Sequence, residues 1–219
     1  MDAKRIIPII RIGEGSEEEL LGRARRLELA GADELLFLGP RQSGQAAWLR
    51  AVARSVFIPV AMSCASADGP ELEETLDAGA DAVVLHLGPA DLPGLARAAL
   101  RFGRQRLRVA MNVIWAPEYG WTVPMPQDPV GRPVVAWIGE LGQMGAGEVL
   151  LSVGPEATGL GALCQMAAHL PLPVLVQGGA QGAALEALLH GADGWAYPEA
   201  LSSPSELKAS LGGHGLALR

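Results

Sequence analysis

The chain has 219 residues, of which 49% are hydrophobic, and its mean hydropathy of +0.23 provides enough apolar surface for a folded core and excludes a disordered chain. A net charge of −7 gives no electrostatic footprint for nucleic acid or anionic lipid. Two cysteines, Cys64 and Cys164, are too few for a disulfide framework and have no zinc-ligand spacing, so neither a metal nor a cofactor is expected. The N-terminus lacks the pattern of a signal peptide and no apolar run reaches the roughly 18 residues of a membrane span, which predicts a cytoplasmic protein.

Strand-like and helix-like segments alternate along the chain. Ser16, followed by three glutamates, has the pattern of a helix N-cap and predicts a helix that runs to about Ala30. Strands are predicted over 4–11, 34–38, 58–62, 82–87 and 107–112, and the helices between them over 45–55, 70–78 and 93–102.

An aromatic and proline-rich excursion over 113–128 interrupts the alternation, and its Tyr119-Gly120 pair predicts a hairpin over the mouth of the fold. The alternation then resumes with helices predicted over 129–144, 161–169 and 181–190 and with strands over 148–153, 174–177 and 194–197. Ser203 opens a last helix, and the segment 212–219 is expected to be loose.

A Gly-Ala pair precedes every second strand, in the phrases GADELLFLGP from Gly31, GADAVVLHLG from Gly79, GAGEVLLSVG from Gly145 and GADGWAYPEA from Gly191. The strands are continuous apolar runs, which is typical of a parallel sheet covered on both faces. The sequence therefore predicts an α/β fold, a single (βα)8 TIM barrel with shortened loops that forms one domain over 1–219. Such a barrel carries its chemistry at the C-terminal ends of its strands.

The opening MDAKRIIPII, the phrases GADELLFL and GAGEVLLS, and the Gly-Gly pair after the seventh barrel strand resemble the HisF-like cyclase subunit of imidazole glycerol phosphate synthase, a histidine-biosynthesis barrel. The resemblance implies general acid and base aspartates at the ends of the first and fifth strands, which act while ammonia is added to a bisphosphorylated ribulosyl substrate. Arg11 and Asn112 stand at these positions. Neither side chain exchanges a proton near neutral pH, so we expect a pseudoenzyme that lacks the family's cyclase activity. Whether the chain is an enzyme at all stays open.

The resemblance also implies phosphate sites at the barrel mouth. The Gly178-Gly179 pair preserves one anion-binding turn after the seventh barrel strand. Thr158 follows the sixth barrel strand and Ser63 stands at the end of the third, and both are candidate ligand-binding residues. Pro198 and Glu199 replace small residues, which disfavours a phosphate there. The first hypothesis is a protein that binds a phosphorylated or anionic small molecule, with Arg11 as a charge partner.

The opposite end of the barrel supports a second hypothesis, a non-catalytic protein that docks a glutaminase-like or other partner. In the family, a ring of four charged residues lines the N-terminal mouth, and three of its positions are matched here by Arg5, Glu34 and Glu148. The fourth, a lysine in the family, is Ala82 here. The neighbouring Asp81 matches an acid that faces the partner in the family. Charges at strand starts also serve stability alone. Trp115, Tyr119 and Trp121 of the hairpin offer an alternative docking surface or ligand-stacking surface.

A third hypothesis is an enzyme with new acid–base chemistry from His86 and Glu156, of lyase or cyclase type. His86 ends the fourth strand and is either a titrating group or a hydrogen-bonded core histidine. Glu156 follows the sixth barrel strand, where an ion pair with Arg11 is the simpler interpretation. Cys64 is either a buried inert thiol or a nucleophile.

Overall fold

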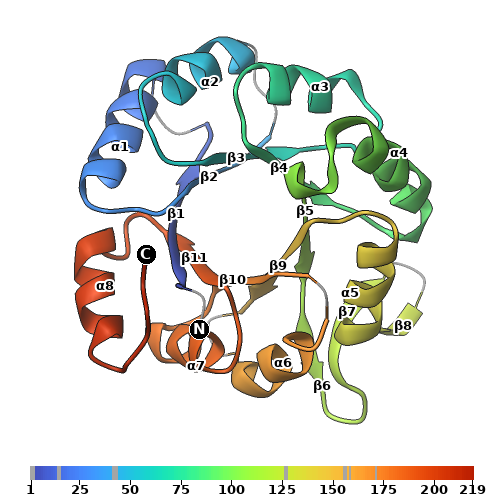
Figure 1. The fold of residues 1–219 in the computed structure, drawn as a ribbon. Coiled ribbons are helices and arrows are strands. Elements are labelled where there is room, and N and C mark those ends of the chain that lie inside the picture. Colours follow the sequence, from blue (N-terminus) through green and yellow to red (C-terminus); the bar gives the residue numbers. More distant parts are fainter. Residues whose placement is uncertain are drawn as a thin grey trace. The chain divides into compact units, whose positions relative to one another are not determined.

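The computed structural model describes residues 3–13, 16–40, 44–125, 128–154, 157, 159–170 and 172–219 (Figure 1). Its main sheet closes into an eight-stranded barrel with the strand order β1-β11-β10-β9-β5-β4-β3-β2. This order confirms the predicted (βα)8 class. The chain divides into two compact units, a first unit of residues 1–85 with 196–219 and a second unit of residues 86–195. One domain over 1–219 stays a prediction.

The first unit holds the opening βα segments and the last helix. Phe37 and Trp48 pack in its core with ring centroids 5.3 Å apart, and both side chains are buried. Strands β1, β2, β3 and β4 pair in parallel in this order. The elements are β1 (Arg5–Arg11), α1 (Glu17–Leu29), β2 (Leu35–Leu38), α2 (Gln45–Ala53), β3 (Val60–Cys64), α3 (Pro70–Asp77), most of β4 (Ala82–His86) and of β11 (Gly194–Pro198), and α8 (Pro204–Gly212).

The second unit is built on three parallel strands in the order β10-β9-β5, which lie side by side (Figure 1). Trp137 of α5 is fully buried in the core of this unit. The elements are α4 (Leu92–Phe102), β5 (Leu107–Asn112), β6 (Ile114–Ala116), β7 (Gly120–Met125), β8 (Asp128–Pro133), α5 (Val134–Gln143), β9 (Glu148–Val153), α6 (Leu160–Ala167), β10 (Val174–Gly178) and α7 (Gln181–Leu189), with 3₁₀ turns at Pro89–Asp91 and Arg104–Arg106.

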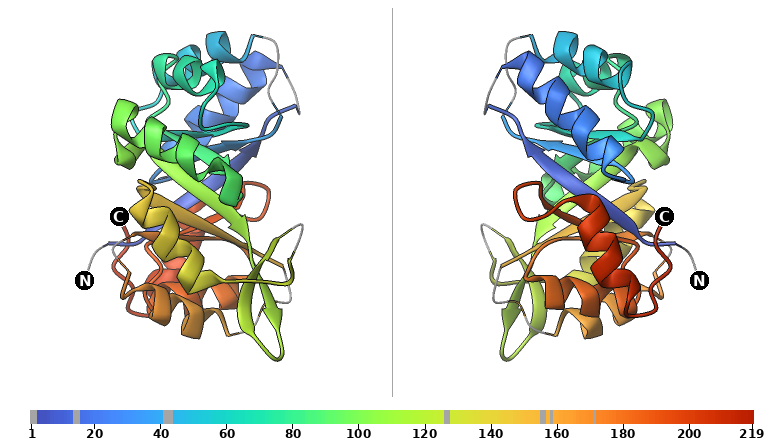
Figure 2. Two further views of the ribbon diagram at one scale, coloured as in Figure 1. Left: turned by 90° about the vertical axis from the view of Figure 1, so that its right-hand side faces the viewer. Right: turned by 90° about the vertical axis from the view of Figure 1, so that its left-hand side faces the viewer.

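The excursion after β5 is an antiparallel three-stranded sheet, β6-β7-β8 (Figure 2). The hairpin itself is confirmed by the β6–β7 pairing, while its position over the mouth stays a prediction. The prediction of a helix from residue 129 is wrong, because α5 begins only at Val134. Gly131 explains the difference. Its φ is +74°, and a Cβ there would lie 2.6 Å from the carbonyl oxygen of Val123, so this glycine allows β8 to approach β7 closely.

The repeated Gly-Ala pairs end the helices that precede β2, β4, β9 and β11. Each glycine has a positive φ, between +89° and +125°. The following alanine donates its N–H to a carbonyl five residues earlier, for example Ala32 to Leu27 at 3.0 Å and Ala146 to Leu141 at 2.9 Å. This is the bond of a Schellman motif, which requires a left-handed residue at the helix end. The repeats are therefore helix stop signals.

An aspartate follows three of the four Gly-Ala pairs and ties two neighbouring strands together. Asp81 accepts the N–H of Val60 at 2.8 Å through its carboxylate, and its own N–H donates to the Val60 carbonyl at 2.8 Å. Asp33 with Ile6 and Asp193 with Val174 form the same two bonds. We call this arrangement the aspartate latch. It aligns the starts of two consecutive parallel strands of the barrel.

The fourth repeat has a glycine in place of the aspartate. Gly147 still donates its N–H to the Leu107 carbonyl at 2.9 Å, but a Cβ there would lie 2.0 Å from the carbonyl oxygen of Arg104. The chain therefore cannot carry a side chain at position 147 without a backbone shift. The difference between GAD and GAG in the sequence thus reflects a local steric limit.

The C-terminal segment 212–219 was expected to be loose, but backbone hydrogen bonds hold it in place. The Lys4 N–H donates to the Ala217 carbonyl at 2.8 Å, and the Arg219 N–H donates to the Lys4 carbonyl at 3.2 Å. Lys208 of α8 lies 2.7 Å from the carboxylate of Asp33 and also donates to the carbonyl oxygen of Arg219. These hydrogen bonds join residues distant in sequence, so local sequence patterns do not predict them. None of the helices in the described part of the chain combines the length and the apolarity needed to cross a membrane.

Candidate functional site

The C-terminal ends of the strands in the first unit are largely occupied by internal contacts. The hydroxyl of Ser63 donates to the Gly39 carbonyl at 2.8 Å and accepts the Gly39 N–H at 3.1 Å. Ser63 lies inside β3, which extends two residues beyond its predicted end. Its hydroxyl therefore bonds the neighbouring turn, and a ligand there would have to compete with both bonds.

The turn after β11 is closed in a similar way. Glu199 forms an ion pair with Arg23 of α1, and about one fifth of each side chain is exposed. The Glu199 N–H donates to the Ile9 carbonyl at 3.3 Å, so this amide already has an acceptor. Arg11 ends β1 with an exposed side chain, and within the described ranges no hydrogen bond or ion pair holds its guanidinium. Arg11 is thus an available cation among the described residues at this end of the first unit.

The second unit presents the predicted glycine turn in a conformation suited to anions. Gly178 and Gly179 have φ values of +82° and +73°, and a Cβ on Gly178 would lie 2.6 Å from the Val153 carbonyl oxygen. Only glycine fits both requirements at position 178. The Trp195 indole N–H donates to the Gly178 carbonyl at 3.1 Å and fixes the turn from below.

Helix α7 begins directly after this turn without a side-chain cap. Ala180 occupies the N-cap position with extended backbone angles, and its methyl group cannot accept a hydrogen bond. The N–H groups of the first helical turn have no acceptor within the helix and carry the positive end of its dipole. A left-handed glycine turn and an uncapped helix start therefore combine into an arrangement that can hold a phosphate group.

Asn112 lies in the same unit, at the exposed end of β5. The strand register pairs Asn112 with Ser152 of β9, and Ser152 with Gln177 of β10. We call these three residues the neutral row. Sequence reasoning overlooked Ser152 and Gln177, although each is the first polar residue that closes an apolar strand run, in VLLS and VLVQ.

The residues proposed for new acid–base chemistry are only partly described. His86 ends β4 with an exposed ring, and partial desolvation lowers its pKa from the ordinary histidine value. Its ring is therefore neutral at neutral pH. Glu156 and Thr158 lie outside the described residues. Cys64 is buried at the end of β3, where its thiol contacts the Ser66 carbonyl at 3.4 Å. Among the described residues, no three His, Cys, Asp or Glu side chains gather into a metal-binding group.

The strand starts carry the predicted charges in pairs. In the first unit, Arg5 and Glu34 form an ion pair at 3.2 Å, and only 4% of the Glu34 side chain is exposed. In the second unit, Glu148 pairs with Arg108 at 2.5 Å, and only 4% of the Arg108 side chain is exposed. Sequence analysis overlooked Arg108, which is the single charge inside the apolar run LRVAM. Each acid thus has an arginine partner on a neighbouring strand.

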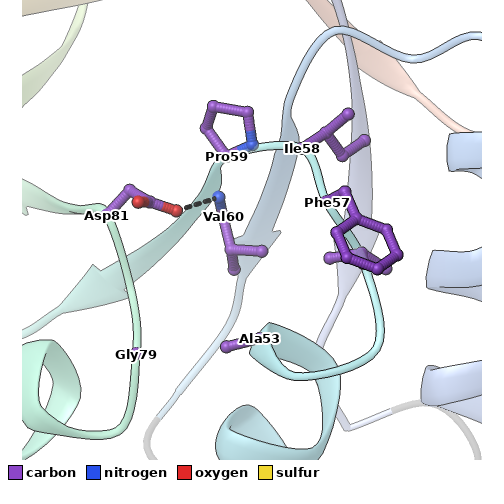
Figure 3. A pocket seen from close by; sticks show the side chains of 8 residues that line it. Ala53, Phe57, Ile58, Pro59, Val60, Gly79 and Asp81 are labelled. Carbon is purple, nitrogen blue, oxygen red and sulfur yellow. Dashed lines mark hydrogen bonds between the residues drawn. The ribbon is translucent and has the colours of Figure 1, made fainter.

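Asp81 borders a pocket of about 270 Å³ at the strand starts of the first unit. The Asp81 carboxylate points toward the Val60 N–H at one side of the pocket, and Gly79 and apolar residues from α2 to β3 form the rest (Figure 3). Phe57 at the rim is 96% exposed, and Leu29 at the end of α1 is 87% exposed. Glu28 of α1 accepts the Phe57 N–H at 2.5 Å through its carboxylate. The pocket is lined by Ala53, Val56, Phe57, Ile58, Pro59, Val60, Gly79 and Asp81.

The aromatic residues of the three-stranded sheet differ in their exposure. Trp115 is 60% exposed and Tyr119 is 56% exposed, whereas Trp121 is only 7% exposed. The Trp115 and Trp121 rings meet edge to face with centroids 5.8 Å apart. Trp121 therefore packs within the sheet, and only the other two side chains are accessible to a ligand or partner.

The closed eight-stranded barrel and its four Gly-Ala repeats define the chain as a (βα)8-barrel protein. No protein-family model matches the sequence. The chain is 32% identical to the imidazole glycerol phosphate synthase subunit HisF of Wolinella succinogenes over 87% of this chain and 86% of the relative. It is 33% identical to the same subunit of Synechococcus sp. CC9902, over 90% of this chain and 86% of the relative. It is 31% identical to that of Synechococcus sp. CC9311, over 100% of this chain and 97% of the relative. The chain belongs to the HisF family.

Proposed function

We propose that this HisF-family barrel binds a phosphorylated small molecule at the turn formed by Gly178, Gly179 and the start of α7. The observation that carries the proposal is the joining of two left-handed glycines to a helix start that no side chain caps. The relatives support it, because their name refers to imidazole glycerol phosphate, a phosphorylated compound.

We also infer that the chain does not perform the cyclase reaction. Proton transfer near neutral pH needs a group that populates both protonation states. Asn112 carries an amide and Arg11 a guanidinium, and neither type of group acts as a proton carrier near neutral pH in proteins. With ammonia and the family's bisphosphorylated substrate, the native protein should give no detectable turnover. Turnover at a rate typical of enzymes would overturn this inference.

A thermal-shift titration with inorganic phosphate tests the binding site. Saturable binding raises the melting temperature, and phosphate at ten times its Kd adds about 1.4 kcal/mol of stability. In Ala180→Asp, the new carboxylate stands at the N-cap position, from which it can accept N–H groups of the first turn of α7. Without phosphate, this variant should be about 1 kcal/mol more stable than the native protein and should therefore melt at a higher temperature. Its melting temperature should no longer rise when phosphate is added.

Gly69→Asp is the matched control, since Gly69 is the uncapped and extended N-cap of α3. It should gain a similar stability and keep the phosphate response. The proposal fails if the native protein shows no saturable shift, or if Ala180→Asp responds to phosphate as the native protein does.

A protein partner is the second candidate, and the exposure of Phe57, which lines the pocket, favours it. A large exposed apolar side chain beside a pocket is typical of docking surfaces. The relatives are named as subunits of a synthase. Co-purification with a glutaminase subunit from the same organism, for the native chain and for Phe57→Ser, tests this candidate. A complex that Phe57→Ser weakens supports docking here, and a complex that the variant leaves intact excludes this surface.

A further inference from the structure

Trp195 holds the glycine turn by a hydrogen bond from within the core. Its indole N–H donates to the Gly178 carbonyl at 3.1 Å, and its side chain is fully buried. Trp195 is the last residue of the second unit and lies on β11, which neighbours β10 in the barrel (Figure 1). A buried indole N–H needs an acceptor, and a backbone carbonyl of the turn provides one.

The turn needs such a contact from outside to fix its peptide groups. Gly178 and Gly179 are adjacent and both left-handed, with φ values of +82° and +73°. Glycine adopts positive and negative φ about equally readily, so a peptide between two glycines can rotate between opposite orientations with little steric penalty. The two glycines alone therefore do not determine which way the N–H between them points.

The bond to Trp195 selects one orientation of this peptide. The described part of the chain contains no cis peptide. In a trans peptide, the carbonyl of one residue and the N–H of the next lie in one plane and point in opposite directions. The Gly178 carbonyl points to the buried indole, so the Gly179 N–H points to the opposite side of the turn.

We propose that Trp195 is a positioning residue that aims the Gly179 N–H at a phosphate bound by the turn. This inference rests on the phosphate site proposed above. Trp195 does not touch the ligand and acts through the peptide between Gly178 and Gly179. Because the indole holds this peptide before the anion arrives, binding does not carry the full entropic cost of ordering two glycines.

The same peptide connects the ligand to the indole. When a phosphate oxygen accepts the Gly179 N–H, the peptide becomes more polarised and the Gly178 carbonyl becomes a stronger acceptor. The hydrogen bond from Trp195 should therefore strengthen when phosphate binds, although phosphate does not contact the ring. A tryptophan that only fills space in the core would not respond in this way.

The indole resonances of the native protein, labelled with ¹⁵N, test this connection during a titration with inorganic phosphate. The indole proton of Trp195 should move downfield and should give the same Kd as the Gly179 amide. The signal that disappears in Trp195→Phe assigns the resonance. Trp137 is also fully buried in the second unit and is the internal control, so its indole proton should not move.

The variant Trp195→Phe removes the indole N–H and keeps a buried aromatic ring. It should weaken the binding of inorganic phosphate by about three- to tenfold in titration calorimetry, the factor that one hydrogen bond contributes. Trp137→Phe removes the same atoms from an equally buried side chain and is the matched control. Its Kd for phosphate should equal that of the native protein.

The outcomes distinguish this proposal from the phosphate site itself. If phosphate binds but the Trp195 indole proton does not respond, or if Trp195→Phe binds phosphate as tightly as the native protein, the positioning role is refuted and the phosphate site stands. If phosphate does not bind, both proposals fail. Equal losses of affinity in Trp195→Phe and Trp137→Phe indicate a packing effect and also refute the positioning role. If Trp195→Phe does not fold, the indole titration of the native protein decides.

Discussion

Replacing Asp81 by alanine separates the two interpretations of this residue, an acid that faces a partner and a latch between β3 and β4. The carboxylate accepts the N–H of Val60 at 2.8 Å, and Val60 is only 1% exposed. A buried N–H that loses a charged acceptor costs about 1–3 kcal/mol. For a chain of this length, a loss of about 2 kcal/mol lowers the melting temperature by roughly 4–8 °C. A residue that served a partner alone would leave the isolated chain unaffected.

Urea unfolding monitored by tryptophan fluorescence measures this difference. Asp81→Asn keeps an oxygen acceptor and should lose less than about 1 kcal/mol, which separates the hydrogen bond from the charge. Asp77→Ala removes an exposed acid from the end of α3 and should stay within about 0.5 kcal/mol of the native protein. The latch is refuted if Asp81→Ala is as stable as Asp77→Ala.

Three further predictions concern the ion pair, the buried tyrosine and the helix stops. Arg108→Met removes the guanidinium that lies 2.5 Å from Glu148 and should lower the free energy of unfolding in urea by about 3–5 kcal/mol. The double variant Arg108→Met/Glu148→Leu should recover most of this loss. Equal losses in the single and double variants would contradict a pairing role. Burial, aided by the Glu199 and Asp33 carboxylates, raises the pKa of Tyr197. The unfolded tyrosine therefore releases its proton first, stability should fall as the pH rises above about 10, and Tyr197→Phe should fall less steeply in the same pH series. Gly145 has φ +99°, and a Cβ there would lie 2.4 Å from the Cβ of Ala99, so Gly145→Ala should lower the free energy of unfolding by more than about 2 kcal/mol. Gly31 has nothing within 4 Å, so Gly31→Ala should cost only about 1–2 kcal/mol of backbone strain. Equal losses in the two variants would refute the steric explanation.

The fold could be predicted because its signals are local and repeated. A continuous apolar run indicates a covered parallel strand, and Gly-Ala after a helix indicates a Schellman end, so the barrel follows from the order of these signals. Ser16 and Ser203 form the capping boxes that their sequence context predicts. One exception is the segment before α5. There, apolar residues and a glycine fit a helix locally, but pairing with β7 decides the structure.

The candidate site was less predictable, because it depends on register and on partners distant in sequence. The resemblance to the HisF family points to Gly178 and Gly179, because the family's glycine pair after the seventh barrel strand is present in this sequence. It does not show that Ser152 and Gln177 align with Asn112, which follows only from strand pairing. Local patterns also cannot reveal that Arg108 meets Glu148, 40 residues away.

The most direct test of the account is an NMR titration of the native protein, labelled with ¹⁵N, with inorganic phosphate. The account predicts saturable shifts that are largest for the amides of Gly178, Gly179 and the first turn of α7, with a single Kd for all of them. Shifts that do not saturate, or that are largest at arginines far from this turn, would contradict the proposal that the barrel holds a phosphate group there.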